Sequence, residues 1–464
     1  VGDELCLLYL RSVIRDLRKS VCPSIFGTMG CGCIYNYCPV IFNQPCRCAE
    51  DVIALVFMTD YPENWQEQTI LLSGNAAEIN IGRALRSGVA LGSRAVSANH
   101  ATFFAAQQGW AVIDHNSTNV QKIVKAYLKM LLSDLGYAGF RYDMVKGYAG
   151  KFTGTYNSDS KPTYSVGEYW DGSAPRVKEW LNATKVSGVI QSAAFDFPFR
   201  YTVRDALRGS TNDKDKNNWN QAPNWSLLGN SSLASDASYR RYAVTFVENH
   251  DTEKRSNDDQ DPIRRDTLAA NAYLLAMPGT PCVFYKHWKD CKNDIAAMIN
   301  VRQFAGIHNQ STYTKYSGYA THYAVMTRGA NCDMLCVVGD VTKYTPTSRW
   351  VAVADGYHYR YYLPNTANTA WISLASGTYM GAQTATLTAV TRDDAQIVYT
   401  TDGTTPTAAS TKAASGTTVT IPTGTTTLTA GLLIGGTVTG IVSRTYTIID
   451  FQPFDIDIYV NTDQ

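Results

Sequence analysis

The sequence predicts an α/β chain: a (β/α)8 TIM barrel followed by an antiparallel β domain and a C-terminal β-sandwich. Up to about residue 307, short apolar strands alternate with helical segments, and several strands run directly into an acidic residue. In a (β/α) barrel the chemistry lies at the C-terminal ends of the strands. After about residue 310 the helical pattern ends, and residues 367–449 form a Thr- and Gly-rich stretch with strands of period two.

Composition limits the classes of function. A chain of 464 residues, 45% of them apolar, is long enough for a barrel and one or two accessory modules. A net charge of +1 argues against nucleic acid or an anionic membrane surface as partner, and no apolar run of 18 residues predicts a membrane span. The 29 Tyr and 9 Trp suit stacking on sugar rings, but they suit ordinary cores equally well.

The cysteines and the N-terminus are less informative. Seven of the 11 cysteines lie in the first 48 residues, and the pairs Cys31-x-Cys33 and Cys46-x-Cys48 lack the C-x-x-C spacing of a zinc site. We therefore favour scattered or locally bridged cysteines over a metal site. The first residues do not resemble a signal peptide, so we expect that a signal has been removed or is missing from this sequence.

The order of elements can be followed from about residue 94. Before it, residues 1–93 show no sustained period, although Val52–Met58 suggests a strand and Ile81–Ala90 a helix. Apolar residues at helical spacing between 120 and 135 predict a helix that Ser117 or Thr118 caps and Gly136 ends. Later segments predict a helix over Arg265–Met277 and a buried strand over Thr280–Tyr285.

Three predicted strands each lead to a carboxylate. They are Ala138–Tyr142 before Asp143, Pro162–Val166 before Glu168, and Tyr242–Val247 before Asp251. One acid at a strand end is more often a helix cap or a surface charge than a catalytic group. Three in succession are harder to explain that way, because parallel strands bring their carboxyl ends to the same rim of a barrel.

Paired carboxylates of this kind suit glycoside hydrolysis. Retention of configuration needs two carboxyl groups about 5–5.5 Å apart, one as nucleophile and one as acid and then base. Arg141 and Asp143 are two apart on a strand, so both side chains point to one face and the cation keeps the carboxylate ionised.

The segments Gly139-Phe140-Arg141-Tyr142-Asp143, Val166-Gly167-Glu168 and Phe246-Val247-Glu248-Asn249-His250-Asp251 resemble motifs of the α-amylase family of glycoside hydrolases. From about residue 108 to 449 the chain is similar to secreted α-amylases of gut and rumen bacteria. The resemblance implies Asp143 as nucleophile, Glu168 as general acid/base, and Asp251 as the carboxylate that stabilises the oxocarbenium-like state.

The same resemblance implies roles for further residues. Arg141 positions the nucleophile, His250 and His100 bind the sugar, and Lys146 and Trp170 line the cleft on the leaving-group side. It also implies a secreted or cell-surface bacterial enzyme that acts as a monomer on starch, glycogen or maltooligosaccharides.

The sequence departs from the family at the motif D-x-V-x-N-H, whose best match is Ala95-Val96-Ser97-Ala98-Asn99-His100. Ala95 replaces the Asp, and Val112 stands where the family has a calcium-binding Asp. Calcium takes six to eight oxygen ligands, and only Asn99 and the carbonyl of Gly147 can be named, so a calcium site stays open. Residues 1–93 match no part of the family; divergence, an insertion or an unreliable sequence each explain this.

We expect residues 1–307 to form the catalytic barrel, 308–366 the antiparallel domain, 367–449 the sandwich, and 450–464 a linker or the start of a truncated module. The sandwich resembles the C-terminal domain of chitobiases, and we favour a spacer over a glucan-binding role because its aromatic residues are sparse. The leading function is endo-hydrolysis of α-1,4-glucan. Alternatives are a related enzyme acting on maltodextrins, branch points or transfer reactions, and a catalytically inactive starch-binding scaffold.

Overall fold

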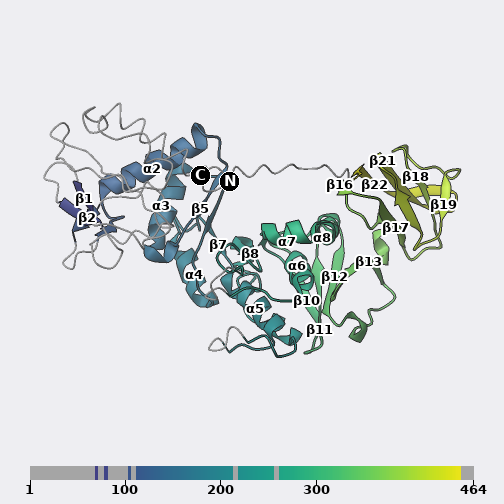
Figure 1. The fold of residues 1–464 in the computed structure, drawn as a ribbon, viewed down its shortest axis with the longest axis horizontal. Helices are drawn as coiled ribbons and strands as arrows, with labels where there is room; N and C mark the ends of the chain where they lie inside the picture. Colours follow the sequence, from purple (N-terminus) through teal and green to yellow (C-terminus); the bar gives the residue numbers. More distant parts are fainter. Residues whose placement is uncertain are drawn as a thin grey trace, which may run out of the picture. The chain divides into compact units, whose positions relative to one another are not determined.

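The computed structural model describes residues 68–71, 78–81, 103–105, 111–212, 218–254 and 261–450 (Figure 1). The chain divides into two compact units, residues 1–170 with 179–193, and residues 171–178 with 194–464. The expected strand Val52–Met58 lies outside the described residues, as does all of the expected helix Ile81–Ala90 except its first residue.

The first strands that the structure describes pair in two separate antiparallel sheets. Strand β1 (Gln68–Leu71) pairs antiparallel with β2 (Glu78–Ile81), and β3 (Phe103–Ala105) pairs antiparallel with β4 (Ala111–Ile113). Neighbouring strands of a (β/α) barrel are parallel. Of the four, only β1 and β2 lie within residues 1–93, and their antiparallel pairing is not that of barrel strands. Most of this region lies outside the described residues, so the first two barrel strands and a closed eight-stranded barrel stay predictions.

Helices and parallel strands alternate in the rest of the first unit. In chain order the elements are α2 (Thr118–Ser133), β5 (Gly139–Tyr142), α3 (Gly150–Ser160) and β6 (Tyr164–Gly167). Strands β5 and β6 pair in parallel. As the sequence predicts, α2 buries its apolar face, through Val120, Val124 and Leu128, and Gly136 beyond its end has a positive φ of 71°.

A buried asparagine ties this helix–strand layer together. The Asn157 amide on α3 accepts from the Tyr142 hydroxyl (2.9 Å) and donates to the Ser165 hydroxyl (2.8 Å) and the Gln191 carbonyl (3.0 Å). Buried amides of this kind are satisfied only when each partner is in place. Asn157 therefore fixes β5 and β6 against each other close to the ends that carry the acidic residues.

The second unit continues the alternation. After α4 (Ala174–Ala183), its elements are β7 (Ala193–Phe195), α5 (Phe197–Arg208), β8 (Ala243–Thr245), α6 (Thr267–Ala276), β9 (Thr280–Pro281), α7 (Tyr285–Asp290) and α8 (Lys292–Ala305). Strands β7, β8 and β9 pair in parallel.

The expected strand Thr280–Tyr285 is wrong beyond Pro281. The chain turns at Phe284 and enters α7, where the Trp288 amide donates to the Phe284 carbonyl at 3.0 Å. Helical hydrogen bonds thus take over at the residues where the apolar run alone indicated a longer strand.

An antiparallel sheet of five strands follows, in the order β10-β11-β12-β14-β13. The strands are β10 (Tyr313–Gly318), β11 (His322–Arg328), β12 (Asp333–Gly339), β13 (Trp350–Gly356) and β14 (Tyr359–Pro364). One face packs on the preceding helices, where the Tyr361 hydroxyl donates to the Ala272 carbonyl of α6 (2.5 Å). The other face has its own apolar core, which includes Leu335, Val337 and Trp350.

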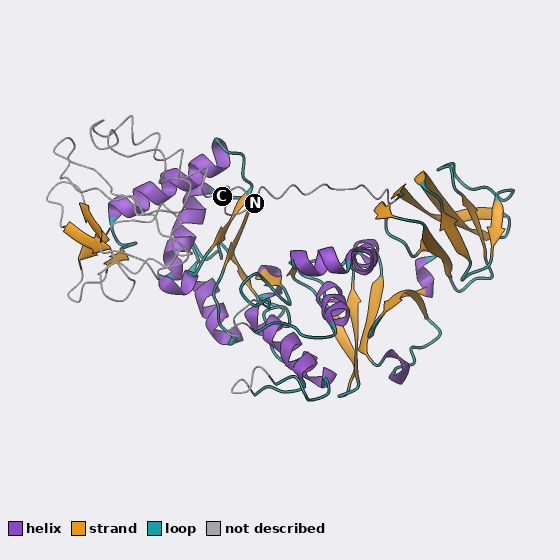
Figure 2. Ribbon diagram, in the orientation of Figure 1, coloured by secondary structure: helices purple, strands orange, loops and turns teal. Residues whose placement is uncertain are grey.

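The C-terminal region is a β-sandwich (Figure 2). One sheet contains β15 (Thr369–Ile372), β17 (Gln383–Val390) and β20 (Thr418–Ile421); the other contains β16 (Gly377–Met380), β18 (Gln396–Thr400), β19 (Thr411–Ala413), β21 (Gly424–Ile434) and β22 (Thr437–Ile449). A core that includes Leu387, Ile397 and Leu428 lies between them. The alternating residues read from the sequence thus form folded strands rather than a low-complexity tail.

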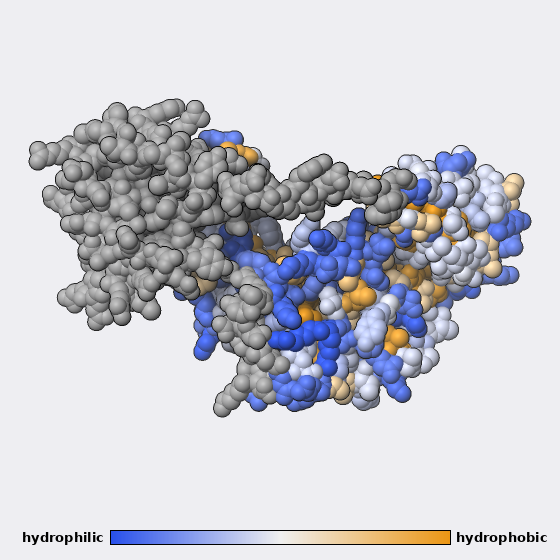
Figure 3. Space-filling model, in the orientation of Figure 1, coloured by the Kyte–Doolittle hydropathy of each residue, from blue (hydrophilic) through white to orange (hydrophobic). Residues whose placement is uncertain are grey.

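Short 3-10 helices connect several elements: η4 (Val145–Gly147), η6 (Trp225–Gly229), η7 (Arg240–Tyr242), η8 (Val341–Lys343) and η9 (Asn365–Ala367). None of the helices in the described ranges combines the length and the apolar character that crossing a bilayer requires. On the face drawn in Figure 3, most of the described surface is polar and its apolar residues form small patches.

Candidate active site

Two of the predicted carboxylates share one guanidinium in the first unit. Arg141 on β5 donates from one terminal nitrogen to Asp143 Oδ1 (2.6 Å) and from the other to Glu168 Oε1 (2.7 Å). Glu168 is 2% exposed, whereas the Asp143 side chain is 27% exposed. Asp143 Oδ2 is buried and has no hydrogen-bond partner among the described residues, so the exposed part of this side chain lies elsewhere on the carboxylate.

The backbone around this pair is held from both strands. The Glu168 amide donates to the Tyr142 carbonyl (2.9 Å), and the Met144 amide donates to Glu168 Oε2 (3.3 Å). Met144 has a φ of 45°, the left-handed conformation that residues other than glycine rarely adopt. Such strain is commonly found at functional sites, and here it accompanies a backbone N–H directed at the buried carboxylate.

The surroundings of Glu168 favour its protonated form. Burial raises the pKa of this carboxyl group, and the negative charge of Asp143 raises it further. The Arg141 guanidinium and the Met144 N–H act in the opposite direction and lower the pKa, but the net shift is upward. A proton donor beside an accessible carboxylate is the combination that acid-assisted nucleophilic substitution requires.

The lack of a side chain at Gly167 allows β6, the strand that leads to Glu168, to pack closely against Trp180. A Cβ at Gly167 would lie 2.2 Å from Cη2 of Trp180, an indole that is 4% exposed, so even a methyl group has no room there. Glycine is thus the only residue type at position 167 that lets β6 approach this ring closely and lead into Glu168.

Gly167→Ala is expected to lower the free energy of unfolding by about 2 kcal/mol, since overpacking a core costs about 1–3 kcal/mol, and to reduce hydrolysis by displacing Glu168. Urea unfolding and steady-state kinetics measure the two effects. Gly167→Ala with Trp180→Phe, which removes the clashing atoms, should recover part of both, with Trp180→Phe alone as the control. A double variant no better than Gly167→Ala would contradict this account.

Lys146 and Trp170 lie beside the carboxylate pair. The Lys146 ammonium donates to the Trp170 carbonyl (3.0 Å) and lies 5.3 Å from the centre of the Tyr169 ring. The Lys146 side chain is exposed and the Trp170 ring is half-buried. Both are thus placed at the surface next to Glu168, but their predicted contact with a leaving group stays a prediction.

Asp251 lies in the second unit, on a turn that follows β8. The Asn249 side-chain oxygen accepts from the Asp251 amide (3.0 Å) and the Thr252 amide (2.9 Å), which fixes the turn. His250 Nε2 lies 3.1 Å from Asp251 Oδ2, and the imidazole is exposed while the carboxylate is 12% exposed. The structure thus brings His250 and Asp251 together, as it does Arg141, Asp143 and Glu168 in the first unit.

The sequence reasoning missed Asp196, although this residue also follows an apolar strand, β7. It is fully buried and accepts from the amides of Phe199 (3.1 Å), Leu233 (3.1 Å) and Ala234 (2.9 Å). Burial raises the pKa of Asp196 to about 6, against the lowering effect of these amides and of Lys178. Asp196 therefore caps α5 and anchors the segment around residue 233, which is a structural task.

Asp196→Ala is expected to lower the free energy of unfolding by about 3 kcal/mol, because each buried N–H left without an acceptor costs about 1–3 kcal/mol. Chemical denaturation monitored by fluorescence measures the loss. Asp196→Asn keeps one acceptor oxygen for the amides and should lose less. Equal stability of Asp196→Ala and wild type would show that the three amides find other acceptors.

The predicted calcium ligands are not assembled in the described part of the chain. Gly147 ends η4 and offers one carbonyl, whereas Asn99, like His100, lies outside the described residues. Within the described ranges, no group of three or more His, Cys, Asp or Glu side chains is arranged to hold a metal ion. Calcium takes six to eight oxygen ligands, and one of the two predicted ligands lies outside the described residues, so a calcium site stays a prediction.

Comparison with known proteins gives matches in both halves of the chain. A family model described as the chitobiase/β-hexosaminidase C-terminal domain matches residues 374–443, and an FHA domain model matches residues 79–123. The chain is 28% identical over 268 residues to "Probable alpha-amylase 2" of Arabidopsis thaliana, which covers 53% of this chain and 60% of the relative.

Two bacterial relatives have similar sequence identities to this chain. The chain is 32% identical over 213 residues to "Glucan 1,4-alpha-maltotetraohydrolase" of Roseateles saccharophilus, covering 42% of this chain and 35% of the relative. It is 32% identical over 179 residues to "Cyclomaltodextrin glucanotransferase" of Bacillus sp. (strain 17-1), covering 38% of this chain and 23% of the relative. The chain thus spans less than two thirds of the length of each of these relatives.

Proposed function

We propose that this chain, a relative of the α-amylase family of glycoside hydrolases, cuts α-1,4-glucosidic bonds within starch and related glucans with retention of configuration. The relatives named above confirm the family resemblance that the sequence motifs indicate, and the C-terminal match confirms the resemblance to chitobiase modules. The activity itself is our proposal, and the Arg141-bridged pair of Asp143 and Glu168 is the observation that carries it.

The geometry of this pair suits a double displacement. The two terminal nitrogens of one guanidinium bind the two carboxylates, so the groups are close. We propose that they act as a retaining pair, in which one carboxylate attacks and the other gives and then takes the proton. The Asp143 carboxylate attacks the anomeric carbon while Glu168 gives its proton to the departing glycosidic oxygen. Glu168 then takes a proton from water, which attacks the same carbon and releases Asp143.

Asp251, in the second unit, has a proposed role that comes from the resemblance of its motif. We place its carboxylate at the sugar hydroxyls, where it stabilises the positive charge that develops on the ring, with His250 as a neighbouring donor to the same sugar. The closed eight-stranded barrel, with residues 1–307 as its span, belongs to this proposal. So does the division into an antiparallel domain at 308–366 and a sandwich at 367–449.

Incubating the full chain with soluble starch and defined maltooligosaccharides tests the function. Chromatography should show products of many chain lengths at early times, and proton NMR should show the α-anomer as the first product. Release from one chain end, or transfer products, would identify a different member of the family. Starch binding without hydrolysis above the level of Glu168→Gln would identify an inactive scaffold.

For the C-terminal sandwich we propose a spacer role. A sugar-binding platform needs exposed aromatic rings, but Tyr379 and Tyr446 are buried in the sandwich core and Tyr399 is half-buried. Tyr399→Ala is therefore expected to leave binding to insoluble starch unchanged in a pull-down assay. A several-fold loss of binding would instead identify a glucan site on this module.

A further inference from the structure

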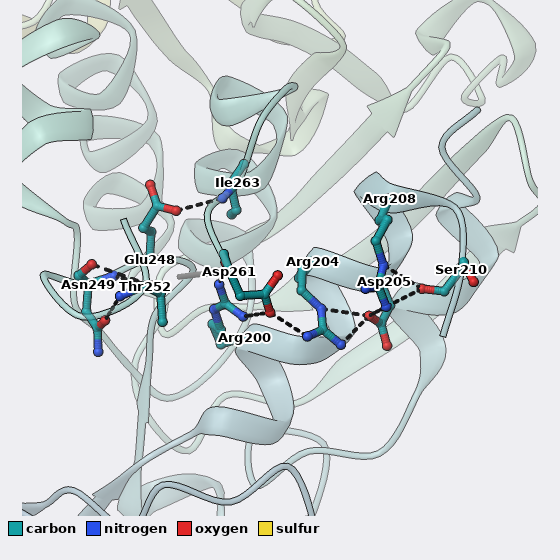
Figure 4. A network of polar contacts seen from close by, with 10 residues as sticks. All are labelled: Arg200, Arg204, Asp205, Arg208, Ser210, Glu248, Asn249, Thr252, Asp261 and Ile263. Atoms are coloured by element: carbon teal, nitrogen blue, oxygen red, sulfur yellow. Dashed lines mark hydrogen bonds and ion pairs between the residues drawn. The ribbon is translucent and has the colours of Figure 1, made fainter. Parts of the chain in front are cut away.

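A row of buried polar side chains connects helices α6 and α7 with the end of strand β8. Asn271 on α6 lies 3.1 Å from His287 on α7, joining amide Nδ2 and imidazole Nδ1. His287 Nε2 lies 2.9 Å from Glu248 Oε2. Glu248 Oε1 accepts from the Ile263 amide at 2.7 Å, a contact drawn in Figure 4. The three side chains are 0%, 6% and 7% exposed, so water does not replace these contacts.

The contacts determine where the imidazole proton lies. The Asn271 amide nitrogen also donates to the Thr267 carbonyl (2.8 Å), and turning the amide over would set two oxygens against each other. His287 Nδ1 faces a donor and therefore accepts. Glu248 is a carboxylate and only accepts, so His287 Nε2 carries the proton and donates it. Asn271 thus donates to His287, and His287 donates to Glu248.

This row ends at the base of the loop that carries Asp251. Glu248 directly precedes Asn249, where the turn begins, and lies three residues before Asp251. The bond from the Ile263 amide to Glu248 joins the backbone before this turn to the backbone at residue 263. On the same segment, Asp261 accepts from Arg200 (2.9 Å) and Arg204 (2.5 Å) of α5. Figure 4 shows these contacts together with the Asn249–Thr252 bonds that shape the turn.

We infer that Glu248 is a positioning residue for Asp251, held in its working orientation by the relay from Asn271 through His287. The inference rests on the proposed function. Two fixed donors hold both oxygens of Glu248, and this fixes the backbone from which the turn with Asn249 and Asp251 begins. A buried carboxylate is a poor choice for stability alone, since apolar residues of similar volume often serve as well or better.

A displacement of Asp251 should weaken stabilisation of the transition state more than binding of the substrate. Asp251 is proposed to act on the charge that develops during bond cleavage, so a small displacement lowers kcat more than it changes KM. A misplacement of about 1 Å at a site residue reduces turnover by about 100-fold. A residue that contributed only to folding would lower the amount of active protein and leave kcat per folded molecule unchanged.

Glu248→Gln tests the relay with nearly the same shape. The new side-chain amide at position 248 sets a donor N–H against the donor Nε2–H of His287. If the His287 proton moves to Nδ1 instead, two donors face each other at Asn271. We expect kcat per folded molecule to fall about 10- to 100-fold, with KM changed less than about threefold. Glu179→Gln, at an exposed position on α4, is the matched control and should behave as wild type.

A second substitution reverses the relay without changing net charge. In Glu248→Gln with Asn271→Asp, the new carboxylate accepts from His287 Nδ1–H, and His287 Nε2 accepts from the new amide. The new carboxylate also loses the bond to Thr267 and sets an oxygen against that carbonyl, so recovery should be partial, with kcat at least about fivefold above that of Glu248→Gln. Nitrogen-15 NMR of labelled histidine, with His287 assigned by its substitution, should show Nε2–H in wild type and Nδ1–H in the double variant.

The proposed hydrolase function and the positioning role of Glu248 would be rejected by different results. A wild type that does not hydrolyse glucan rejects the proposed function, and the catalytic role of Glu248 with it, whatever the NMR shows. An active wild type with unchanged kcat in Glu248→Gln, or a double variant no better than the single one, overturns the inference alone. An Nδ1–H tautomer in wild type overturns the relay directly.

Discussion

Replacing Glu168 with Gln is expected to lower kcat on soluble starch by about 10³-fold and to leave KM nearly unchanged. General acid–base catalysis contributes about 10²–10⁴-fold, and Glu168 is proposed to act in both steps, first as acid and then as base. Gln has almost the same shape and keeps an oxygen for Arg141, so substrate binding and folding should persist. Steady-state kinetics and thermal melting, with Glu179→Gln as the surface control, measure both effects.

Azide provides a sharper test of the two carboxylate roles. In Glu168→Ala, azide needs no base and attacks the glycosyl group on Asp143, so activity on an activated glucosyl fluoride should return with an α-glycosyl azide as product. In Asp143→Ala, azide takes the place of the nucleophile and should give the β-azide. Identical products from the two variants would show that the roles of nucleophile and acid have been assigned wrongly.

The local part of the site could be predicted from the sequence because its rules are local. Strand residues two apart face the same side, and Arg141 does pair with Asp143. The apolar runs that end at Asp143 and Glu168 form β5 and β6, with boundaries within two residues of the predicted ones. The alternation between residues 383 and 390, and between 418 and 421, likewise forms strands β17 and β20.

Other features depend on which elements meet in space. Arg141 reaches Glu168 only because β5 and β6 are parallel neighbours that place Arg141 opposite Val166. The relay from Asn271 to Glu248 needs α6, α7 and β8 to pack together, and none of these residues belongs to a pattern of spacing. Nothing in the sequence distinguishes Met144, whose positive φ arises from the tight turn between Asp143 and η4.

The start of the chain shows a different limit. Hydrophobic periodicity predicts an element only when one face is buried over several turns or strands, and residues 1–93 have no such pattern. The expectation that this region supplies two barrel strands came from the closure of a barrel, which is a rule about the whole fold. The pair described there, β1 with β2, is short and antiparallel, and the rest of residues 1–93 lies outside the described part of the chain, so the two barrel strands stay a prediction.

Replacing Arg141 with Met is expected to lower kcat by at least about 100-fold and to change the pH profile in a defined direction. Arg141 is the one cation that donates to both Asp143 and Glu168 in the described site. Burial raises the pKa of Glu168, and Arg141 is the largest influence that lowers it. Without Arg141 the pKa of Glu168 must rise further, because the charge that favours its ionised form is lost.

Loss of Arg141 should shift the alkaline limb of the pH profile to higher pH, because Glu168 must be protonated for the first step. Glu168 acts as an acid in the first step, so activity falls as the pH rises through its pKa, and a higher pKa moves this alkaline limb to higher pH. Arg141→Met should therefore be slower at every pH and yet keep a larger fraction of its maximum rate in alkaline buffer. The pH dependence of kcat/KM for wild type and variant, measured on one short maltooligosaccharide, shows this directly.

Arg141→Lys separates charge from geometry in the same experiment. Lysine keeps the positive charge but lacks the planar fork that binds two carboxylates at once. It should therefore hold the alkaline limb near its wild-type position while losing about tenfold in kcat. If Arg141→Lys and Arg141→Met shift the limb equally, the charge of Arg141 does not set the pKa of Glu168, and burial and Asp143 alone determine it.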